Sequence, residues 1–297
     1  MTKKLLVTGA SGFLGWNLCL AAQKRYTVHG TCNTHHYFID GIDMHSIDLC
    51  DRNMLDKLFK EISPDIVIHT AAAADPNYCQ NNPDVSQEIN VTASASLAQR
   101  CADYGIPFVF TSTDLVFDGN NAPYHEDDPV SPVSLYGEQK AAAEQAILAS
   151  CPGSVVCRMP LMYGDAPVHA KSFIHPMISA ITDHRTLTLF TDEFRCPCSA
   201  KDAAEGLLLA PERGMHGILH LGGPQRLSRY DMGTLLGDAL NIPPNLAAAK
   251  QSDVRMSAPR PPDVTLDSSK ATTLGFAPKT MAERLSELAI IKKYRDF

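Results

Sequence analysis

Short apolar runs alternate with longer segments whose apolar residues recur at helical spacing through the first half of the chain. The apolar runs predict strands at residues 5–7, 26–31, 65–69, 108–110 and 155–157. Helices are predicted between them at residues 51–62, about 84–104 and about 136–148, and a short strand-like segment ends at Asp48-Leu49. Apolar strands that alternate with helices indicate an α/β fold with a doubly wound parallel sheet.

After about residue 163 the alternation becomes less regular. This half predicts a helix with loops at 164–195, a helix at 202–210, a strand at 217–221 and a helix at 230–240, with a Thr280-to-Glu283 capping box opening the last helix. We therefore expect a sheet domain at residues 1–163 and a smaller α/β lobe at 164–297. Part of the second half, around 192–221, is expected to return to the sheet domain.

Composition narrows the possible functions. The 297 residues are 44% apolar and carry a net charge of −7 without a run of Lys or Arg, which argues against nucleic-acid and membrane partners. No apolar stretch reaches the roughly 18 residues of a membrane span, and the N-terminus leads directly into a strand, so a cytoplasmic protein is expected.

Metal binding is not expected from the sequence. The nine cysteines are scattered, and Cys196-Pro-Cys198 lacks a second pair of ligands. The pair His35-His36 and the residues His216 and His220 are interpreted as ordinary loop and strand histidines.

A glycine-rich turn directly follows the first predicted strand. Gly9, Gly12 and Gly15 stand three residues apart and precede a helix. This arrangement is typical of Rossmann-type dinucleotide sites, where the glycines allow a tight turn, close approach of the pyrophosphate and helix–strand packing. The helix N-terminus adds free N–H groups and a positive dipole end. We expect the cofactor to contact Gly9, Ser11, Gly12, Phe13, Leu14 and Gly15.

A candidate catalytic pair opens the predicted helix at 136–148. Tyr136 and Lys140 stand four residues apart, so they share one helix face. A free tyrosine has a pKa of about 10, and a neighbouring ammonium is expected to lower the pKa of Tyr136. Thr113 is expected to hydrogen-bond the carbonyl oxygen that Tyr136 protonates, with a nicotinamide supplying the hydride. Such a pair alone is more often part of a solvated helix face. The glycine turn and Thr113 earlier in the chain favour catalysis instead.

Together these segments resemble the extended short-chain dehydrogenase/reductases over nearly the whole chain. The resemblance rests on residues 8–15, Asp48-Leu49, Ala71-Ala72, Asn90, Ser112-Thr113, Tyr136 and Lys140. Within that superfamily, residues 112–119 and 192–194, Pro197 and Arg260-Pro261 resemble the dTDP-4-dehydrorhamnose reductases. Residues 266–270 are similar to the regulatory β subunits of methionine adenosyltransferase, which belong to the same branch.

The resemblance implies roles for individual residues. Thr113, Tyr136 and Lys140 form the catalytic set, and Tyr136 and Lys140 also contact the cofactor. The further cofactor-binding residues are Thr31, Asn33, Asp48, Leu49, Ala71, Ala72, Ala73 and Asn90. The expected substrate-binding residues are Asp114, Val116, Arg158, Arg195 and Arg260. Three of these have plainer interpretations: Asp48 as a solvated carboxylate, Asn90 as a polar helix residue and Arg158 as an ion-pair partner.

Some positions depart from the reductase pattern. Met159-Pro160 follows the strand where those enzymes usually have Trp, Glu193 and Cys198 replace the usual Gln and Thr, and residues 75–78 lack the usual charged pattern of the substrate loop. The resemblance therefore supports hydride chemistry more strongly than one particular sugar.

The residues at the end of the second predicted strand are the basis for predicting which cofactor is preferred. No acidic residue stands there to bind the ribose hydroxyls of NAD, whereas Thr31, Asn33 and Thr34 would tolerate a 2′-phosphate. This favours NADP(H) modestly over NAD(H).

We therefore expect an NADP(H)-dependent reductase of a 4-keto sugar nucleotide. An NAD-dependent epimerase or dehydratase of sugar nucleotides is an alternative, although dehydratases generally place an acid where this chain has Leu115. A non-catalytic, nucleotide-binding regulatory subunit is another. The alanine-rich segments 93–98 and 141–143 predict a homodimer through close helix packing.

Overall fold

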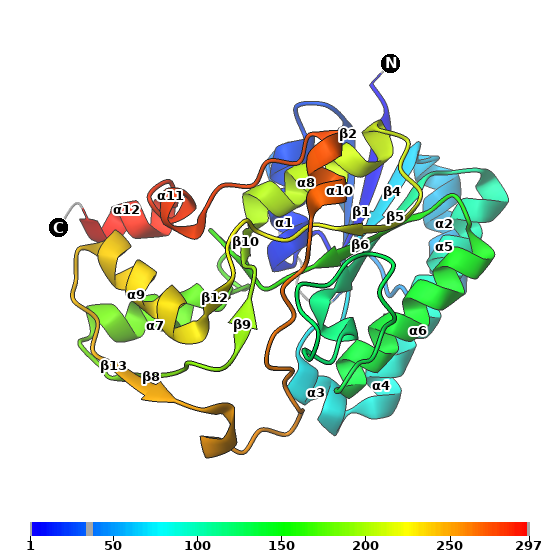
Figure 1. The fold of residues 1–297 in the computed structure, drawn as a ribbon. Coiled ribbons are helices and arrows are strands. Elements are labelled where there is room, and N and C mark those ends of the chain that lie inside the picture. The colour runs from blue at the N-terminus through cyan, green and yellow to red at the C-terminus, as the bar shows by residue number, and fades with distance from the viewer. Residues whose placement is uncertain (1, 34–37, 296–297) are drawn as a thin grey trace.

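Seven parallel strands form the central sheet, as the sequence predicts (Figure 1). The computed structural model describes residues 2–33 and 38–295. Along the sheet the strands lie in the order β11 (Gly217–His220), β6 (Val155–Met159), β5 (Phe108–Thr113), β4 (Ile66–His69), β1 (Lys4–Thr8), β2 (Thr27–Cys32) and β3 (Asp43–Ser46). The direction of winding reverses between β1 and β4, and ligands of such sheets bind at this switch point.

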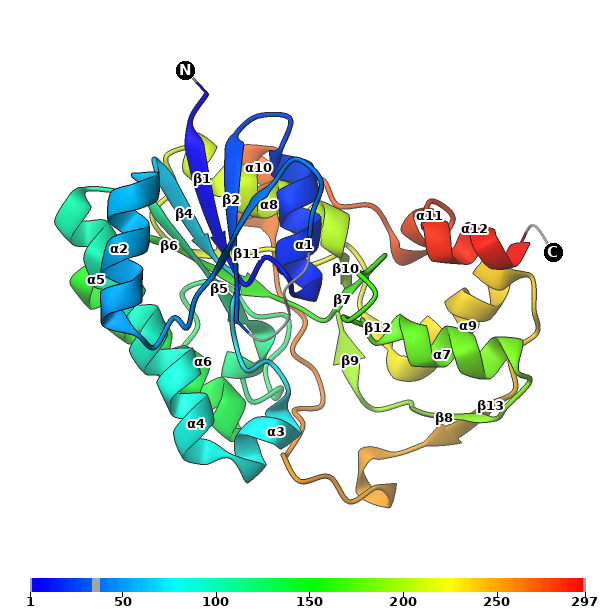
Figure 2. The ribbon, with the colours of Figure 1, turned by 180° about the vertical axis from the view of Figure 1, so that it is seen from behind.

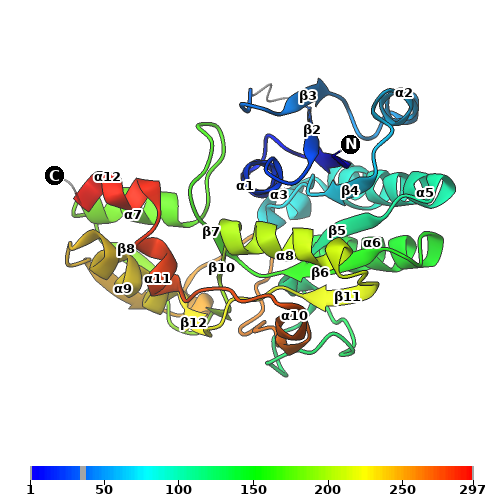
Figure 3. The same ribbon diagram turned by 90° about the horizontal axis from the view of Figure 1, so that it is seen from above.

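Helices cover both faces of the sheet, which Figure 3 shows from above. One face carries α2 (Arg52–Ile62), α5 (Ser94–Tyr104) and α6 (Leu135–Ser150), and the other carries α1 (Phe13–Ala22), α8 (Ala200–Glu212) and α10 (Ser269–Leu274). Successive side chains of a strand point to opposite faces of the sheet, so each face has its own apolar core. Leu5 and Val7 pack towards α1 and α8, whereas Leu6 packs towards α2 and α5. The apolar residues of both cores are almost fully buried.

A separate apolar cluster forms the core of the smaller lobe, which lies beside the carboxyl ends of the strands (Figure 2). It is built by α7 (Ile174–Thr182), α9 (Arg229–Leu240), α11 (Met281–Leu285) and α12 (Ala289–Arg295). Three short ladders accompany the lobe: β7 (Met162–Tyr163) with β10 (Cys198–Ser199), β9 (Phe194–Arg195) with β12 (Leu227–Ser228), and β8 (Leu187–Phe190) with β13 (Leu246–Ala249). The last of these lies within the lobe, where both strands pack on α9. Between these ladders, α8 and β11 return to the central sheet.

The helix predicted at about 84–104 is confirmed. It runs without a break through α4 (Pro83–Gln87), a π-helical segment, η1 (Glu88–Ala93), and α5. A short helix that was not predicted, α3 (Pro76–Asn81), precedes it after β4, and Asp75 caps α3 with its side chain. A proline opens both α3 and α4, and Asn82 separates the two helices.

One pair of strands differs from the expected pattern. The pair β8 and β13 was not predicted, because Leu246–Ala249 is helix-favouring in composition and becomes a strand only through its partner.

The alanine-rich segments lie partly inside the protein. Ala93, Ala98, Ala141 and Ala143 are buried, whereas Ala142 of α6 is exposed. The homodimer stays a prediction.

Candidate active site

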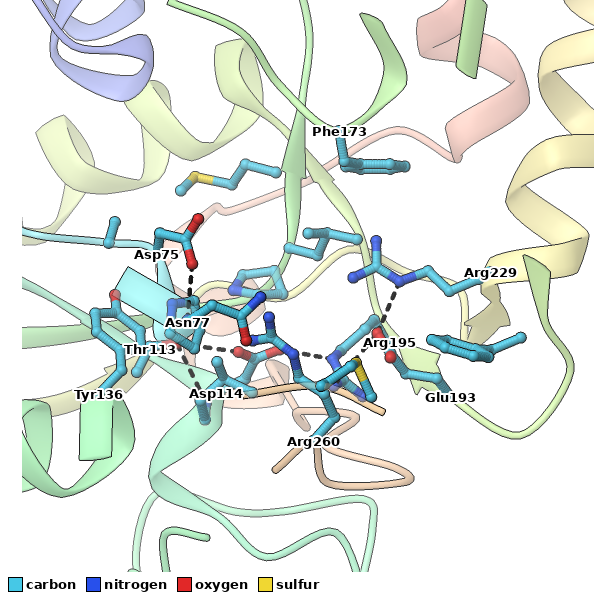
Figure 4. Close-up of a pocket in the computed structure, with 18 of the residues that line it drawn as sticks. Asp75, Asn77, Thr113, Asp114, Tyr136, Phe173, Glu193, Arg195, Arg229 and Arg260 are labelled. Carbon is cyan, nitrogen blue, oxygen red and sulfur yellow. Dashed lines mark hydrogen bonds and ion pairs between the residues drawn. The ribbon is translucent and has the colours of Figure 1, made fainter. Parts of the chain in front are cut away.

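A close approach of two backbone segments brings Tyr136 beside Thr113. Thr113 ends β5, and the 3₁₀ turn η2 (Asp114–Val116) follows it. Ser134 caps α6 by accepting a hydrogen bond from the Gly137 N–H, 3.3 Å away. A Cβ at Gly137 would lie 2.2 Å from the carbonyl oxygen of Leu115, so only glycine lets the start of α6 approach this turn. Thr113 and Tyr136 thereby line the same cavity (Figure 4).

The protonation of Tyr136 differs from the sequence-based expectation. Burial is the main cause that raises the pKa of Tyr136, and Asp114 raises it further, while a hydrogen bond with Thr113 lowers it. Lys140 is 1% exposed, and burial lowers the pKa of its ammonium to about 7. The expected lowering of the tyrosine pKa by Lys140 is therefore absent, because burial penalises both charged forms. At neutral pH Tyr136 keeps its proton.

Lys140 lies below the wall of the cavity rather than in it. Its ammonium is 4.0 Å from the centroid of the Phe110 ring, and Glu144 follows one helical turn later. Glu144 in turn accepts a hydrogen bond from Ser112 and pairs with Arg158. This buried polar layer supports α6 from behind.

Asn90 holds the segment after β4 in place. Its Oδ1 accepts from the Ala73 N–H at 2.9 Å, and its Nδ2 donates to the Ala73 carbonyl at 3.1 Å and to Gln139 Oε1 at 2.9 Å. Asn90 is fully buried within η1, so it positions Ala73 against α6. Asn90 was predicted to bind the cofactor, but in the structure its side chain holds the backbone of Ala73.

The larger of two neighbouring cavities has a volume of about 780 Å³ and lies between the sheet and the smaller lobe. Its wall carries charged residues of both signs: Asp75, Asp114, Glu193, Arg195, Arg229 and Arg260 (Figure 4). Apolar residues complete it, among them Met159, Leu161, Phe173, Met177 and Leu189. A polar group can therefore be bound at one side and an apolar surface at the other.

The charges at the floor of this cavity form a network. Arg229 Nε donates to Glu193 Oε1 at 2.7 Å, and Arg195 Nη2 lies 3.6 Å from the same oxygen. Arg195 Nε is 3.9 Å from Asp114 Oδ2. Burial raises the pKa of Asp114 to about 6, although Arg195 and Thr113 act in the opposite direction. Asp114 is the weakest acid of this network, because it is buried and only partly paired.

The smaller cavity, about 210 Å³, surrounds the glycine turn before α1. Gly9 has a φ of +70°, and a Cβ there would lie 2.7 Å from Ala71 Cα. A Cβ at Gly15 would lie 2.2 Å from the Gly9 carbonyl oxygen, whereas one at Gly12 meets only that oxygen, at 3.2 Å. Gly9 and Gly15 therefore build the turn, and Gly12 keeps its outer side open. This open turn at a helix N-terminus fits the pyrophosphate of a dinucleotide.

Half of the predicted cofactor residues line this smaller cavity: Gly9, Ser11, Gly12, Thr31, Asn33, Leu49, Ala71 and Ala72. Ala74 and Asp75, which follow them along the chain, line the larger cavity, so one segment borders both. Phe13 and Leu14 begin α1, where Leu14 is buried in the core. Asp48 is exposed and accepts a hydrogen bond from the Cys50 N–H at 2.9 Å. Thr34, His35 and His36 lie outside the described residues.

Two residues predicted to bind substrate do not reach the cavity. Arg158 is 2% exposed and pairs with Glu144 at 2.8 Å. Val116 is fully buried in an apolar cluster with Phe117 and Leu266. The strand-end position of Arg158 was therefore misleading, because the guanidinium turns into the protein to neutralise a buried carboxylate. Asp114, Arg195 and Arg260 do line the cavity.

The sequence interpretation missed Arg229 as a candidate binding residue. Arg229 is the first residue of α9 and lies within the capping box that Ser228 and Asp231 form, and its guanidinium lies 5.3 Å from the Phe173 ring centroid. The capping box was a detectable signal for the helix start, but only the docking of the lobe turns Arg229 towards Glu193 and the cavity.

Comparison with known proteins identifies related sequences over the whole chain. The family model of the RmlD substrate binding domain matches residues 3–294. The probable low-salt glycan biosynthesis reductase Agl14 of Haloferax volcanii is 30% identical, covering 95% of this chain and 96% of that protein. Methionine adenosyltransferase 2 subunit beta of Pongo abelii is 29% identical, covering 99% of this chain and 90% of that subunit.

Solved structures agree with this relationship. A dTDP-4-dehydrorhamnose reductase from Clostridium acetobutylicum superposes with a TM-score of 0.85 at 25% identity, covering 98% of this chain and 99% of the other. A dTDP-4-dehydrorhamnose reductase from Bacillus anthracis, in complex with NADP, has the same fold, with a TM-score of 0.87 at 21% identity, covering 98% of this chain and 99% of the other. Within the described part of this chain, no helix combines the length and apolar character of a membrane span.

Proposed function

Because the chain belongs to the RmlD substrate binding domain family of extended short-chain dehydrogenase/reductases, which are NAD(P)-dependent oxidoreductases, we propose that it reduces a 4-keto sugar nucleotide with NADP(H). The observation that carries this proposal is the shared cavity of Thr113 and Tyr136, bordered by the same segment as the glycine turn. A carbonyl group placed between these hydroxyls meets two hydrogen-bond donors.

Different residues of the chain have different roles at that carbonyl group. A nicotinamide cofactor, when bound, supplies the hydride to the carbonyl carbon. Tyr136 holds its proton at neutral pH, because burial raises its pKa, and can give that proton to the carbonyl oxygen. Thr113 donates a second hydrogen bond that stabilises negative charge on that oxygen. Lys140 supports Tyr136 from the next turn of α6.

The cations of the larger cavity support a phosphorylated substrate. Arg229 and Arg260 both line it. A guanidinium binds phosphate oxygens through two parallel hydrogen bonds. We propose that these two residues hold the diphosphate of the sugar nucleotide, while Asp114 accepts a hydrogen bond from a sugar hydroxyl.

The preference for NADP(H) is proposed from the smaller cavity. Thr31 and Asn33 line it, and neither would repel a 2′-phosphate. A bacterial protein of the same fold is in complex with NADP, which agrees with this preference.

The test is oxidation of NADPH and NADH at equal concentrations over a panel of nucleotide-linked 4-keto sugars. We expect NADPH to be consumed with at least one member and one alcohol to form per cofactor oxidised. The corresponding 4-hydroxy sugars serve as matched controls and should consume none. If the purified protein retains tightly bound NAD and inverts a 4-hydroxyl without net oxidation, the epimerase alternative is correct and the proposal is wrong.

A regulatory role without turnover is the second candidate. It is favoured by the similarity of nearly the whole chain to methionine adenosyltransferase 2 beta subunits. In that case the protein would bind NADP(H), oxidise none of it over the panel, and co-purify with a methionine adenosyltransferase catalytic subunit. Mixing the two proteins and measuring the mass of the complex by light scattering distinguishes this candidate from the reductase.

A further inference from the structure

Three side chains meet on one face of the sheet edge, and none of them lines either cavity. β3 is the outermost strand, next to β2 (Figure 3). The parallel register places His29 of β2 opposite Asp43 of β3. Because strand side chains alternate between faces, His45 lies on the same face as Asp43. Two imidazoles and one carboxylate are therefore brought together by strand pairing alone.

Their ligand atoms form a nearly equilateral triangle. His29 Nδ1 lies 3.2 Å from His45 Nε2 and 3.3 Å from Asp43 Oδ2, and His45 Nε2 lies 3.5 Å from that same oxygen. Ligands of a tetrahedral Zn²⁺, at about 2.0–2.1 Å from the ion, are about 3.3–3.4 Å apart. Octahedral ligands at the same bond length are closer, about 2.9 Å apart. The triangle matches one face of a tetrahedron.

We propose that His29, Asp43 and His45 bind a divalent transition-metal ion of the zinc type, with a water molecule as the fourth ligand. Imidazole nitrogen and carboxylate oxygen are both ligands that Zn²⁺ accepts. The proposal does not depend on the catalytic assignment, because the three residues lie outside both cavities.

The charges around the site act in opposite directions on a bound cation, and the site is open to solvent. Lys4 faces His29 from β1 and opposes a cation, whereas the carboxylate of Asp43 attracts one. The Asp43 side chain is 66% exposed, which leaves the site open to solvent and to an entering ion.

A bound ion would link the edge strand β3 to its neighbour β2. Thr31, the register partner of His45, lines the smaller cavity, so the site lies next to the cofactor-binding wall. The sequence analysis did not expect any metal site, since the two histidines and the aspartate are separated along the chain by other residues and by one strand connection.

The experiment titrates chelator-treated, full-length protein with Zn²⁺ and Co²⁺. Equilibrium dialysis gives the number of Zn²⁺ ions, and the visible spectrum of Co²⁺ reports tetrahedral coordination. We expect one ion per chain, an intense Co²⁺ spectrum without a thiolate charge-transfer band, and a higher melting temperature with Zn²⁺. His29→Gln, His45→Gln and Asp43→Asn should each weaken binding at least ~10-fold.

Two controls separate this site from other histidines. His125→Gln changes an exposed histidine elsewhere, and the double variant His35→Gln/His36→Gln changes the sequence pair outside the described residues. Both should bind Zn²⁺ as the wild type does. The proposal is overturned if the wild type shows no saturable binding, or if the double variant loses binding while His29→Gln and His45→Gln keep it. Should the histidine variants fail to fold, the exposed Asp43→Asn variant decides the question.

Discussion

The Oδ2 atom of Asp114 lies 3.9 Å from Nε of Arg195 and, among the described residues, has no hydrogen-bond partner. Asp114 is 3% exposed and immediately follows Thr113. Burial raises the pKa of Asp114 to about 6. Arg195 offsets this rise only in part, because its guanidinium lies between Asp114 and Glu193. A carboxylate in this state is available to a ligand, and it destabilises the protein in the absence of one.

The first prediction concerns stability against pH. Because the native pKa of Asp114 exceeds its ordinary value of 3.8, the native protein binds more protons than the unfolded chain between pH 4 and 6. Ionisation therefore lowers the free energy of unfolding as pH rises through this window, by up to about 3 kcal/mol. Asp114→Asn should melt above the wild type at pH 7.5, and the difference should vanish near pH 4. Calorimetry at several pH values measures it, with exposed Asp40→Asn as the control.

The second prediction separates proton donation from cofactor binding. Tyr136→Phe removes only the hydroxyl that shares the cavity with Thr113. Turnover should fall at least ~100-fold, because general-acid catalysis contributes about 10²–10⁴-fold. NADPH affinity, measured by fluorescence quenching, should stay within about twofold of the wild type, since the glycine turn holds the cofactor. Tyr104→Phe, an exposed tyrosine, is the control. Retained turnover in Tyr136→Phe contradicts the proposed proton donor.

The third prediction concerns Lys140. Its native pKa of about 7 lies below its ordinary value of 10.5, so the native protein binds fewer protons than the unfolded chain between these values. The penalty for the buried ammonium is full below pH 7 and is relieved as pH rises towards 10.5. Lys140→Met should exceed the wild type in stability at pH 6 by a few kcal/mol, with a smaller excess at pH 10, and should lose turnover. Lys57→Met on the surface should change neither.

The fourth prediction compares two glycines of one turn. Gly15→Ala places a Cβ 2.2 Å from the Gly9 carbonyl oxygen and should destabilise the protein by about 2–3 kcal/mol. Gly12→Ala meets that oxygen only at 3.2 Å, so it should fold, yet weaken NADPH binding at least ~10-fold by occupying the approach of the pyrophosphate. Denaturant unfolding and NADPH titration measure the two effects. Gly153→Ala, which meets no atom within 4 Å, should change neither.

The fifth prediction tests the diphosphate assignment. Arg229→Gln should raise the KM for the sugar nucleotide about tenfold or more, because each guanidinium–phosphate contact is charge-assisted. It should change kcat less than KM, because a contact with the diphosphate is made equally in the bound substrate and in the transition state. Steady-state kinetics measure both, with exposed Arg213→Gln as the matched control. An unchanged KM would place the diphosphate elsewhere.

The sequence by itself determined the central sheet and the glycine turn before α1. Runs of buried apolar residues specify strands wherever they occur, and the backbone requirements at Gly9 and Gly15 are local, so neighbouring residues are sufficient to predict them. The same holds for Tyr136 and Lys140, which helical spacing alone places on one face.

Tertiary structure decided everything that depends on residues distant in sequence. Arg158 and Arg229 are both arginines at the ends of elements, yet one pairs with buried Glu144 and the other lines the cavity, because the partners of each come from other parts of the chain. The meeting of His29 with His45 likewise follows from strand register. A side chain's environment sets its charge and direction, and that environment exists only after the chain has folded.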